Sequence, residues 1–167
     1  MERPGITKMH GNPLTLLGPD VKEGDKAPDF IVLDNDLKEV KLSDFKGKTI
    51  IISAVPSLDT PVCELQTVRF NQEASKLNAK ILTISMDLPF AQKRFCDSLK
   101  INDALTLSDF KDKNFANNFG LYIKELGLIA RAVFVINDEG IITYREIVGE
   151  VSEQPDYDKV LEAASKL

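Results

Sequence analysis

The chain has 167 residues, the size of one ordinary domain that buries about 70% of its unfolded surface. It carries 26 acidic and 21 basic residues, a formal charge of −5, and no basic block. These features argue against nucleic acid or an anionic membrane surface as its main partner.

Segments that would direct the chain to a membrane or out of the cell are not recognisable. No stretch approaches the roughly 18 apolar residues of a membrane span, and no signal-peptide core follows the first residues. We therefore expect a cytoplasmic protein. Permanent disulfides are uncommon in that compartment, so a bond between the two cysteines, Cys63 and Cys96, would be transient and catalytic. Two cysteines and the single His10 lack the spacing of a metal site, and His10 is expected in a surface hairpin.

The first elements are short and extended. Residues 6–16 place a Gly-Asn turn between two extended runs, which predicts an N-terminal β-hairpin. Residues 29–33 form the first candidate core strand. Residues 40–42 are extended, and one helical turn capped by Ser43 is predicted over 43–45.

The middle of the chain reads as a βαβ unit. Residues 49–55 are a nearly continuous, β-branched apolar run, typical of a strand buried on both faces. A helix is predicted over 61–77, with Val62, Leu65 and Val68 toward the core, and a strand over 80–86. Strands joined in this way are parallel, and open α/β sheets place ligand sites at the carboxyl ends of such strands.

Cys63 falls in the first turn of this helix. Pro61 suits the first helical position, because its missing N–H would be unpaired there, and Thr60 is then the N-cap. The helix dipole and unpaired N–H groups stabilise a thiolate, the reactive form of cysteine. The Thr60 hydroxyl can reach either the backbone N–H of Cys63 or its sulfur. From the residues alone, a buried Cys63 that acts only as a small apolar side chain is equally compatible.

The second half of the chain alternates helices and strands. A helix over 89–99 carries Cys96, with Phe90 and Phe95 expected in the core. Then come a strand over 104–107, a helix over 114–119 ended by Gly120, a strand over 128–136, a hairpin turn, a strand over 141–148 and a helix over 155–167. The pattern predicts one α/β domain over 1–167, with a central mixed sheet and flanking helices.

Arg131 is the one charged residue inside the apolar run 128–136. A guanidinium keeps its proton, and within a buried strand it needs an anionic partner or strong acceptors. A structural salt bridge and a place beside the Cys63 thiolate are equally open. Arg69, further along the Cys63 helix, is a second and weaker candidate cation.

Four strings of the sequence resemble one family. Pro56, Thr60 and Cys63 form the Pro-x-x-x-Thr-x-x-Cys pattern of the peroxiredoxins. The fuller string Pro-Ser-Leu-Asp-Thr-Pro-Val-Cys is similar to the thiol peroxidase subfamily of the atypical two-cysteine type. So are Asp87-Leu-Pro-Phe-Ala-Gln-Lys-Arg-Phe-Cys96, Ala130-Arg-Ala-Val and Pro155-Asp-Tyr. The resemblance runs over almost the whole chain.

The resemblance implies a thioredoxin-like fold, a homodimer and the reduction of hydrogen peroxide and organic hydroperoxides. It implies that Cys63 is the peroxidatic cysteine and Cys96 the resolving cysteine, while Pro56, Thr60 and Arg131 complete the pocket. A Cys63 sulfenic acid would condense with Cys96 to an intrachain disulfide, which thioredoxin would reduce. This chemistry requires no metal, haem or flavin cofactor.

Two other functions compete with this interpretation. A thioredoxin-like thiol:disulfide oxidoreductase usually carries Cys-x-x-Cys, whereas here position 60 is Thr and the second cysteine stands 33 residues after the first. A non-enzymatic redox sensor would use the disulfide to switch a partner-binding surface. Peroxide consumption under excess dithiol separates these functions, since an enzyme consumes many equivalents and a sensor about one.

Overall fold

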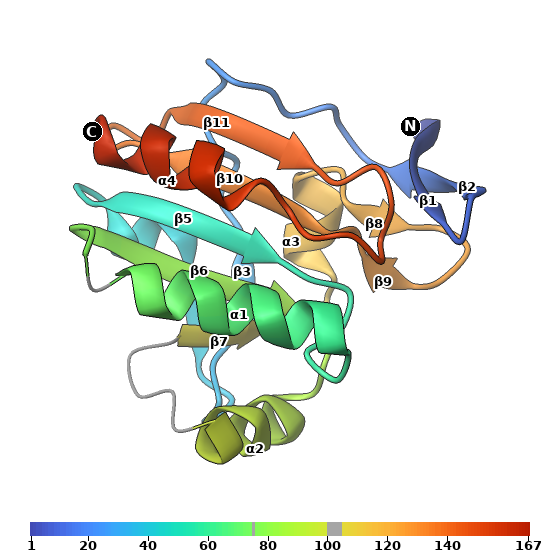
Figure 1. The fold of residues 1–167 in the computed structure, drawn as a ribbon, viewed down its shortest axis with the longest axis horizontal. Helices are drawn as coiled ribbons and strands as arrows, with labels where there is room; N and C mark the ends of the chain where they lie inside the picture. The colour runs from blue at the N-terminus through green and yellow to red at the C-terminus, as the bar shows by residue number, and fades with distance from the viewer. Residues whose placement is uncertain (75, 100–104) are drawn as a thin grey trace.

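The computed structural model describes residues 1–74, 76–99 and 105–167. Over these residues the chain forms a seven-stranded sheet and a four-stranded sheet, with helices packed on the larger sheet (Figure 1).

The larger sheet has the order β11-β10-β5-β6-β7-β3-β4. Its parallel centre consists of β5 (Thr49–Ala54), β6 (Ala79–Ser85) and β7 (Leu105–Ser108). The flanking strands are antiparallel to their neighbours: β3 (Ile31–Leu33), β4 (Glu39–Lys41), β10 (Ala132–Ile136) and β11 (Ile142–Ile147). The prediction of a central mixed sheet is confirmed. A 3₁₀ turn, η1 (Leu42–Phe45), leads from β4 towards β5, and Lys41 rather than Ser43 precedes it as the N-cap.

Helices cover both faces of this sheet. Figure 1 shows α1 (Pro61–Ala74) and α4 (Tyr157–Ser165) in front of the sheet and α3 (Asn114–Asn118) behind it. Along β5, Ile50 and Ile52 belong to the core on the α3 side, whereas Ile51 belongs to the core beneath α1 and α4. The β5 strand is therefore buried on both faces, as its continuous apolar run predicts. The remaining helix, α2 (Pro89–Leu99), lies beside β7 at one end of the molecule.

The smaller sheet has the order β1-β2-β8-β9. The predicted hairpin is present as β1 (Glu2–Met9) and β2 (Asn12–Leu17), and β2 pairs with β8 (Tyr122–Ile123). The turn residues His10 and Gly11 have φ values of 51° and 81°, a conformation that glycine adopts freely and other residues seldom do.

The predicted strand over 128–136 is divided. β9 (Leu128–Ile129) pairs with β8 in the small sheet, while β10 pairs with β5 and β11 in the large sheet. Ala130 and Arg131 connect the two. The apolar run is continuous because both halves are buried, and hydropathy does not show a change of pairing partner.

Other boundaries and faces differ from the sequence predictions. Residues 76–78 form a turn, so the helix predicted to residue 77 ends earlier, and α4 begins at Tyr157 because Asp156 caps it. Leu65 and Phe90, both expected in the core, are 53% and 67% exposed. Residue 104 of the predicted strand 104–107 lies outside the described residues. None of the helices in the described ranges is long and apolar enough to cross a membrane.

Candidate active site

The start of α1 fixes the position of Cys63. Cys63 is the third residue of the helix and is fully buried, just after the carboxyl end of β5. Its backbone N–H donates to Oγ1 of Thr60 at 3.2 Å, and the N–H of Glu64 donates to the Thr60 carbonyl at 2.9 Å. The prediction that Thr60 is the N-cap is confirmed. Of the two predicted contacts of its hydroxyl, the structure has the one to the backbone.

Arg131 lies against the Cys63 sulfur. One of its terminal nitrogens donates to Sγ of Cys63 at 3.0 Å, the other to Oε1 of Gln66 at 2.8 Å, and Nε donates to the carbonyl of Val151 at 2.9 Å. Arg131 is only 2% exposed. These acceptors include no carboxylate. A buried guanidinium favours an anionic partner, and of these three acceptors only the Cys63 sulfur is an ionisable group.

Gln66 is a site residue that sequence reasoning missed. It is fully buried, and its Nε2 donates to Oγ of Ser53 on β5 at 2.7 Å, while its Oε1 accepts from Arg131. Because a guanidinium can only donate, Arg131 fixes the Gln66 amide with its oxygen towards Arg131 and its nitrogen towards Ser53. A signal was available, since Gln66 stands one turn after Cys63 on the same helix face. A polar side chain on the buried face of a helix needs a buried hydrogen-bond partner.

A cavity of about 220 Å³ opens beside Cys63. It contains the predicted site residues Pro56, Thr60, Cys63 and Arg131, and its remaining lining is mostly apolar: Met9, His10, Ser57, Val62, Leu126, Leu128, Val151 and Ser152. Met9 and His10 come from the N-terminal hairpin. The hairpin therefore does more than extend the sheet, because its tip forms part of the rim of the cavity.

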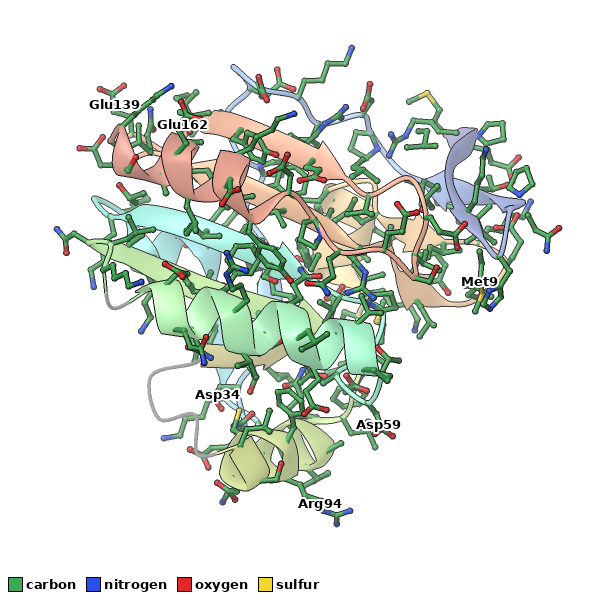
Figure 2. The ribbon with its side chains drawn as sticks, viewed as in Figure 1. Met9, Asp34, Asp59, Arg94, Glu139 and Glu162 are labelled. Carbon is green, nitrogen blue, oxygen red and sulfur yellow. The ribbon has the colours of Figure 1, made fainter. Side chains whose placement is uncertain are left out.

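A larger hollow of about 580 Å³ is lined in part by Lys26, Lys46, Lys48 and Glu139. Figure 2 shows Glu139 at the opposite end of the molecule from Met9 and Asp59, which mark the end with the Cys63 cavity. This hollow holds neither cysteine and no arginine. The smaller cavity is the candidate active site, because it alone of the two contains a nucleophile with a cation beside it.

Cys96 lies on the buried side of α2 and is 8% exposed. Its Sγ is 3.4 Å from Oγ1 of Thr106, and the Thr106 hydroxyl donates its only proton to Oδ1 of Asn35 at 3.1 Å. The Cys96 S–H is therefore the donor towards Thr106. Neither cysteine is in a disulfide. Phe95, next to Cys96 in sequence, packs against a small cluster of Val55, Leu58 and Cys63.

The weaker cation candidate, Arg69, has another partner. Its guanidinium lies 4.9 Å from the centre of the Tyr157 ring, and its Nε is 3.8 Å from the Glu73 carboxylate. Burial raises the pKa of Tyr157 to about 12, although Arg131 and Arg69 oppose that shift. Within the described part of the chain, no group of three or more His, Cys, Asp or Glu side chains could hold a metal ion.

Comparison with known proteins identifies the family. A family model described as Redoxin matches residues 22–161. A thiol peroxidase of Halalkalibacterium halodurans is 56% identical over 155 residues, which cover 92% of this chain and 93% of that protein. The chain belongs to the thiol peroxidase family of peroxiredoxins. A second thiol peroxidase, from Bacillus subtilis, is 53% identical over 158 residues, which cover 94% of this chain and 95% of the relative.

Solved structures agree with this assignment. A peroxiredoxin-like protein from Aquifex aeolicus has a TM-score of 0.91 and 40% identity, covering 99% of this thiol peroxidase chain and 98% of that one. A thiol peroxidase from Chromobacterium violaceum has a TM-score of 0.83 at 18% identity, with 93% of each chain covered, and shows likeness of fold alone. The resemblance and the thioredoxin-like fold predicted from the sequence are confirmed. The roles of individual residues remain predictions.

Proposed function

We propose that this thiol peroxidase reduces hydrogen peroxide and organic hydroperoxides at the sulfur of Cys63, with Cys96 as the resolving cysteine and thioredoxin as the reductant. The observation that carries the proposal is the 3.0 Å contact between Arg131 and Cys63 Sγ beside a cavity at a helix N-terminus. A buried cation and a helix dipole both favour the thiolate.

In the first step the Cys63 thiolate attacks the terminal oxygen of the hydroperoxide. The O–O bond breaks and the sulfur becomes a sulfenic acid, while the departing alkoxide, or hydroxide from hydrogen peroxide, takes a proton from solvent to give an alcohol or water. Arg131 stabilises charge on the departing oxygen, and Thr60 holds the peroxide in line. Pro56, half-buried on the cavity wall, shields the sulfur from water.

In the second step the Cys96 thiol condenses with the sulfenic acid to form the disulfide and releases water. The two cysteines are carried by separately packed helices, α1 and α2, and a disulfide needs Cα atoms within about 7 Å. We therefore expect local unwinding at one or both helices before the bond closes. A dithiol such as that of thioredoxin then reduces the disulfide by thiol–disulfide exchange.

The apolar lining of the cavity supports organic hydroperoxides as substrates alongside hydrogen peroxide. Met9, Leu126, Leu128 and Val151 face the space next to Cys63, and an alkyl group placed there is removed from water. The proposal further includes one domain over residues 1–167, a homodimer, a cytoplasmic location and catalysis by the protein's side chains without a cofactor.

The test is steady-state peroxide consumption with thioredoxin, comparing hydrogen peroxide with a bulky alkyl hydroperoxide. We expect each protein molecule to consume many equivalents of peroxide. The alkyl hydroperoxide should be reduced at least as fast as hydrogen peroxide. Consumption of a single equivalent would favour the redox sensor. Reduction of protein disulfides without peroxide turnover would favour the oxidoreductase. The Cys96→Ser variant is expected to react once with peroxide and then fail to turn over with thioredoxin.

A further inference from the structure

Asp87, in the loop between β6 and α2, is bonded to the segment that leads into Cys63. Its Oδ1 accepts the hydroxyl proton of Ser57 at 2.7 Å, and its Oδ2 accepts the backbone N–H of Leu58 at 2.6 Å. Oδ2 also accepts the hydroxyl proton of Ser85 at 2.8 Å. Asp87 is itself outside the lining of the Cys63 cavity. Asp87 therefore contacts the loop before Cys63 without lining the cavity beside the sulfur.

The two serine hydroxyls determine which groups donate and which accept in this hydrogen-bond network. Each hydroxyl has one proton and donates it to Asp87. Ser57 Oγ in turn accepts the N–H of Asp59 at 3.1 Å, and Ser85 Oγ accepts from Nε2 of Gln92 at 3.0 Å. Hydrogen bonds from both sides thus end on one carboxylate, and hydrogen bonds to an ionised acceptor are stronger than neutral ones.

One branch reaches the catalytic loop. The Ser57 carbonyl accepts the hydroxyl proton of Thr60 at 3.4 Å, and Thr60 caps the helix at Cys63. Leu58, whose N–H is bonded to Asp87, packs in the same small cluster as Cys63. Holding Ser57 and Leu58 therefore also holds the cap and one wall around the sulfur.

The other branch reaches the helix of the second cysteine. Gln92 is buried on α2 four residues before Cys96, so both side chains share the face turned to β7. Besides Ser85, its Nε2 donates to the Leu107 carbonyl of β7 at 2.8 Å. The Ser108 hydroxyl, also on β7, donates to the Asp87 carbonyl at 2.5 Å. Asp87 is thus joined to both of the segments that carry the two cysteines, at least one of which must move for the proposed disulfide to form.

We propose that Asp87 is a positioning residue that holds the Cys63 loop and the Cys96 helix in the closed arrangement used for peroxide attack, and so slows disulfide formation. The inference rests on the proposed function, in which the same two cysteines carry both steps. Peroxide attack needs the cap at Cys63 intact, whereas closing the disulfide needs it opened. One residue that stabilises the closed state therefore affects the two rates in opposite directions.

The test is Asp87→Asn, which keeps the shape of the side chain but turns one acceptor into a donor that faces existing donors. Rapid quenching followed by intact-mass analysis measures the appearance of the sulfenic acid and then of the disulfide. Loss of one charge-assisted hydrogen bond is expected to slow the first step and accelerate the second, each by about tenfold. The peroxide concentration that drives Cys63 to a sulfinic acid should rise accordingly.

The matched control is Asp97→Asn, the same change at an exposed position on α2. Both of its rates should equal those of the wild type. General loosening of the fold would lower both rates together or leave the disulfide step unchanged, and either result in Asp87→Asn overturns the inference. Should that variant fail to fold, Ser57→Ala removes the hydrogen bond to Asp87 and the one from the Asp59 N–H, and leaves the charge of Asp87 in place. The first step should again slow and the second accelerate, by smaller factors.

Wild-type protein oxidised with one equivalent of peroxide separates the inference from the proposed function. If no bond between Cys63 and Cys96 appears there, the proposed function fails and the role of Asp87 fails with it. If the bond appears in the wild type and forms at the same rate in Asp87→Asn, only the role of Asp87 is wrong.

Discussion

The two cysteines lie in different surroundings. Cys63 stands in the first turn of a helix, with a buried guanidinium 3.0 Å from its sulfur and a cavity beside it. Cys96 stands in the body of α2, outside that cavity, and its sulfur donates a proton to the hydroxyl of Thr106. Cys63 thus faces a buried cation at a helix N-terminus, whereas the partner of Cys96 is a neutral hydroxyl.

This difference supports the separate tasks that we propose for the two cysteines. The sulfur that we propose to attack the peroxide is the one that borders the cavity and the guanidinium. Cys96 lies outside that cavity, so under the proposed function it reacts only after Cys63 has been oxidised. Substitutions that remove one feature of each environment test this account.

The largest effect is expected for Cys63→Ser. A serine hydroxyl is a far weaker nucleophile than a thiolate at neutral pH, so peroxidase activity should disappear. The measurement is peroxide consumption with thioredoxin, with circular dichroism to confirm folding. Substantial remaining turnover would remove Cys63 from the mechanism and make the two environments irrelevant to it.

A smaller loss is expected for Arg131→Met, which keeps the length of the side chain and removes its charge and donors. Removal of one preorganised donor typically costs about 10²- to 10³-fold in rate, and a loss of that size is expected in the rate of sulfenic acid formation. Arg69→Met is the matched control, because Arg69 stacks on Tyr157 and pairs with Glu73. An unchanged rate in Arg131→Met would make Arg131 a structural residue only.

The features predicted correctly from the sequence depend on neighbours in the chain. The run 49–55, Pro61 and Thr60 are enough to place Cys63 at a helix start after a buried strand, because capping and strand burial act over a few residues. Arg131 was found because a charge within an apolar run requires a buried partner. Its partner was left open, since hydropathy shows burial but not which element lies opposite.

The features that were missed depend on residues far apart in the chain. Gln66 bonds Arg131 across 65 positions, and Asp87 bonds Ser57 across 30. The apolar stripe of the Cys63 helix predicts a buried Leu65, and the size and hydrophobicity of Phe90 predict that it is buried too, yet both side chains are exposed. A helical pattern states which residues share a face, and the packing of the other elements decides whether that face is buried.

The smallest effect is expected for Thr106→Val, which preserves the shape of the side chain and removes the acceptor of the Cys96 proton. Freed from this neutral hydrogen bond, Cys96 should leave its place more readily, and disulfide formation should accelerate by about two- to tenfold. Formation of the sulfenic acid at Cys63 should not change. Rapid quenching and mass analysis give both rates.

Ser98→Ala is the control for Thr106→Val. Ser98 is an exposed residue of α2 whose hydroxyl donates to the Phe95 carbonyl at 2.9 Å, so its removal takes a hydroxyl from the same helix without touching the thiol. Slower disulfide formation in Thr106→Val would mean that Thr106 assists the loss of the Cys96 proton instead of retaining it. The surroundings of Cys63 and of Cys96 would then both activate their sulfur, and they would differ only in how strongly they do so.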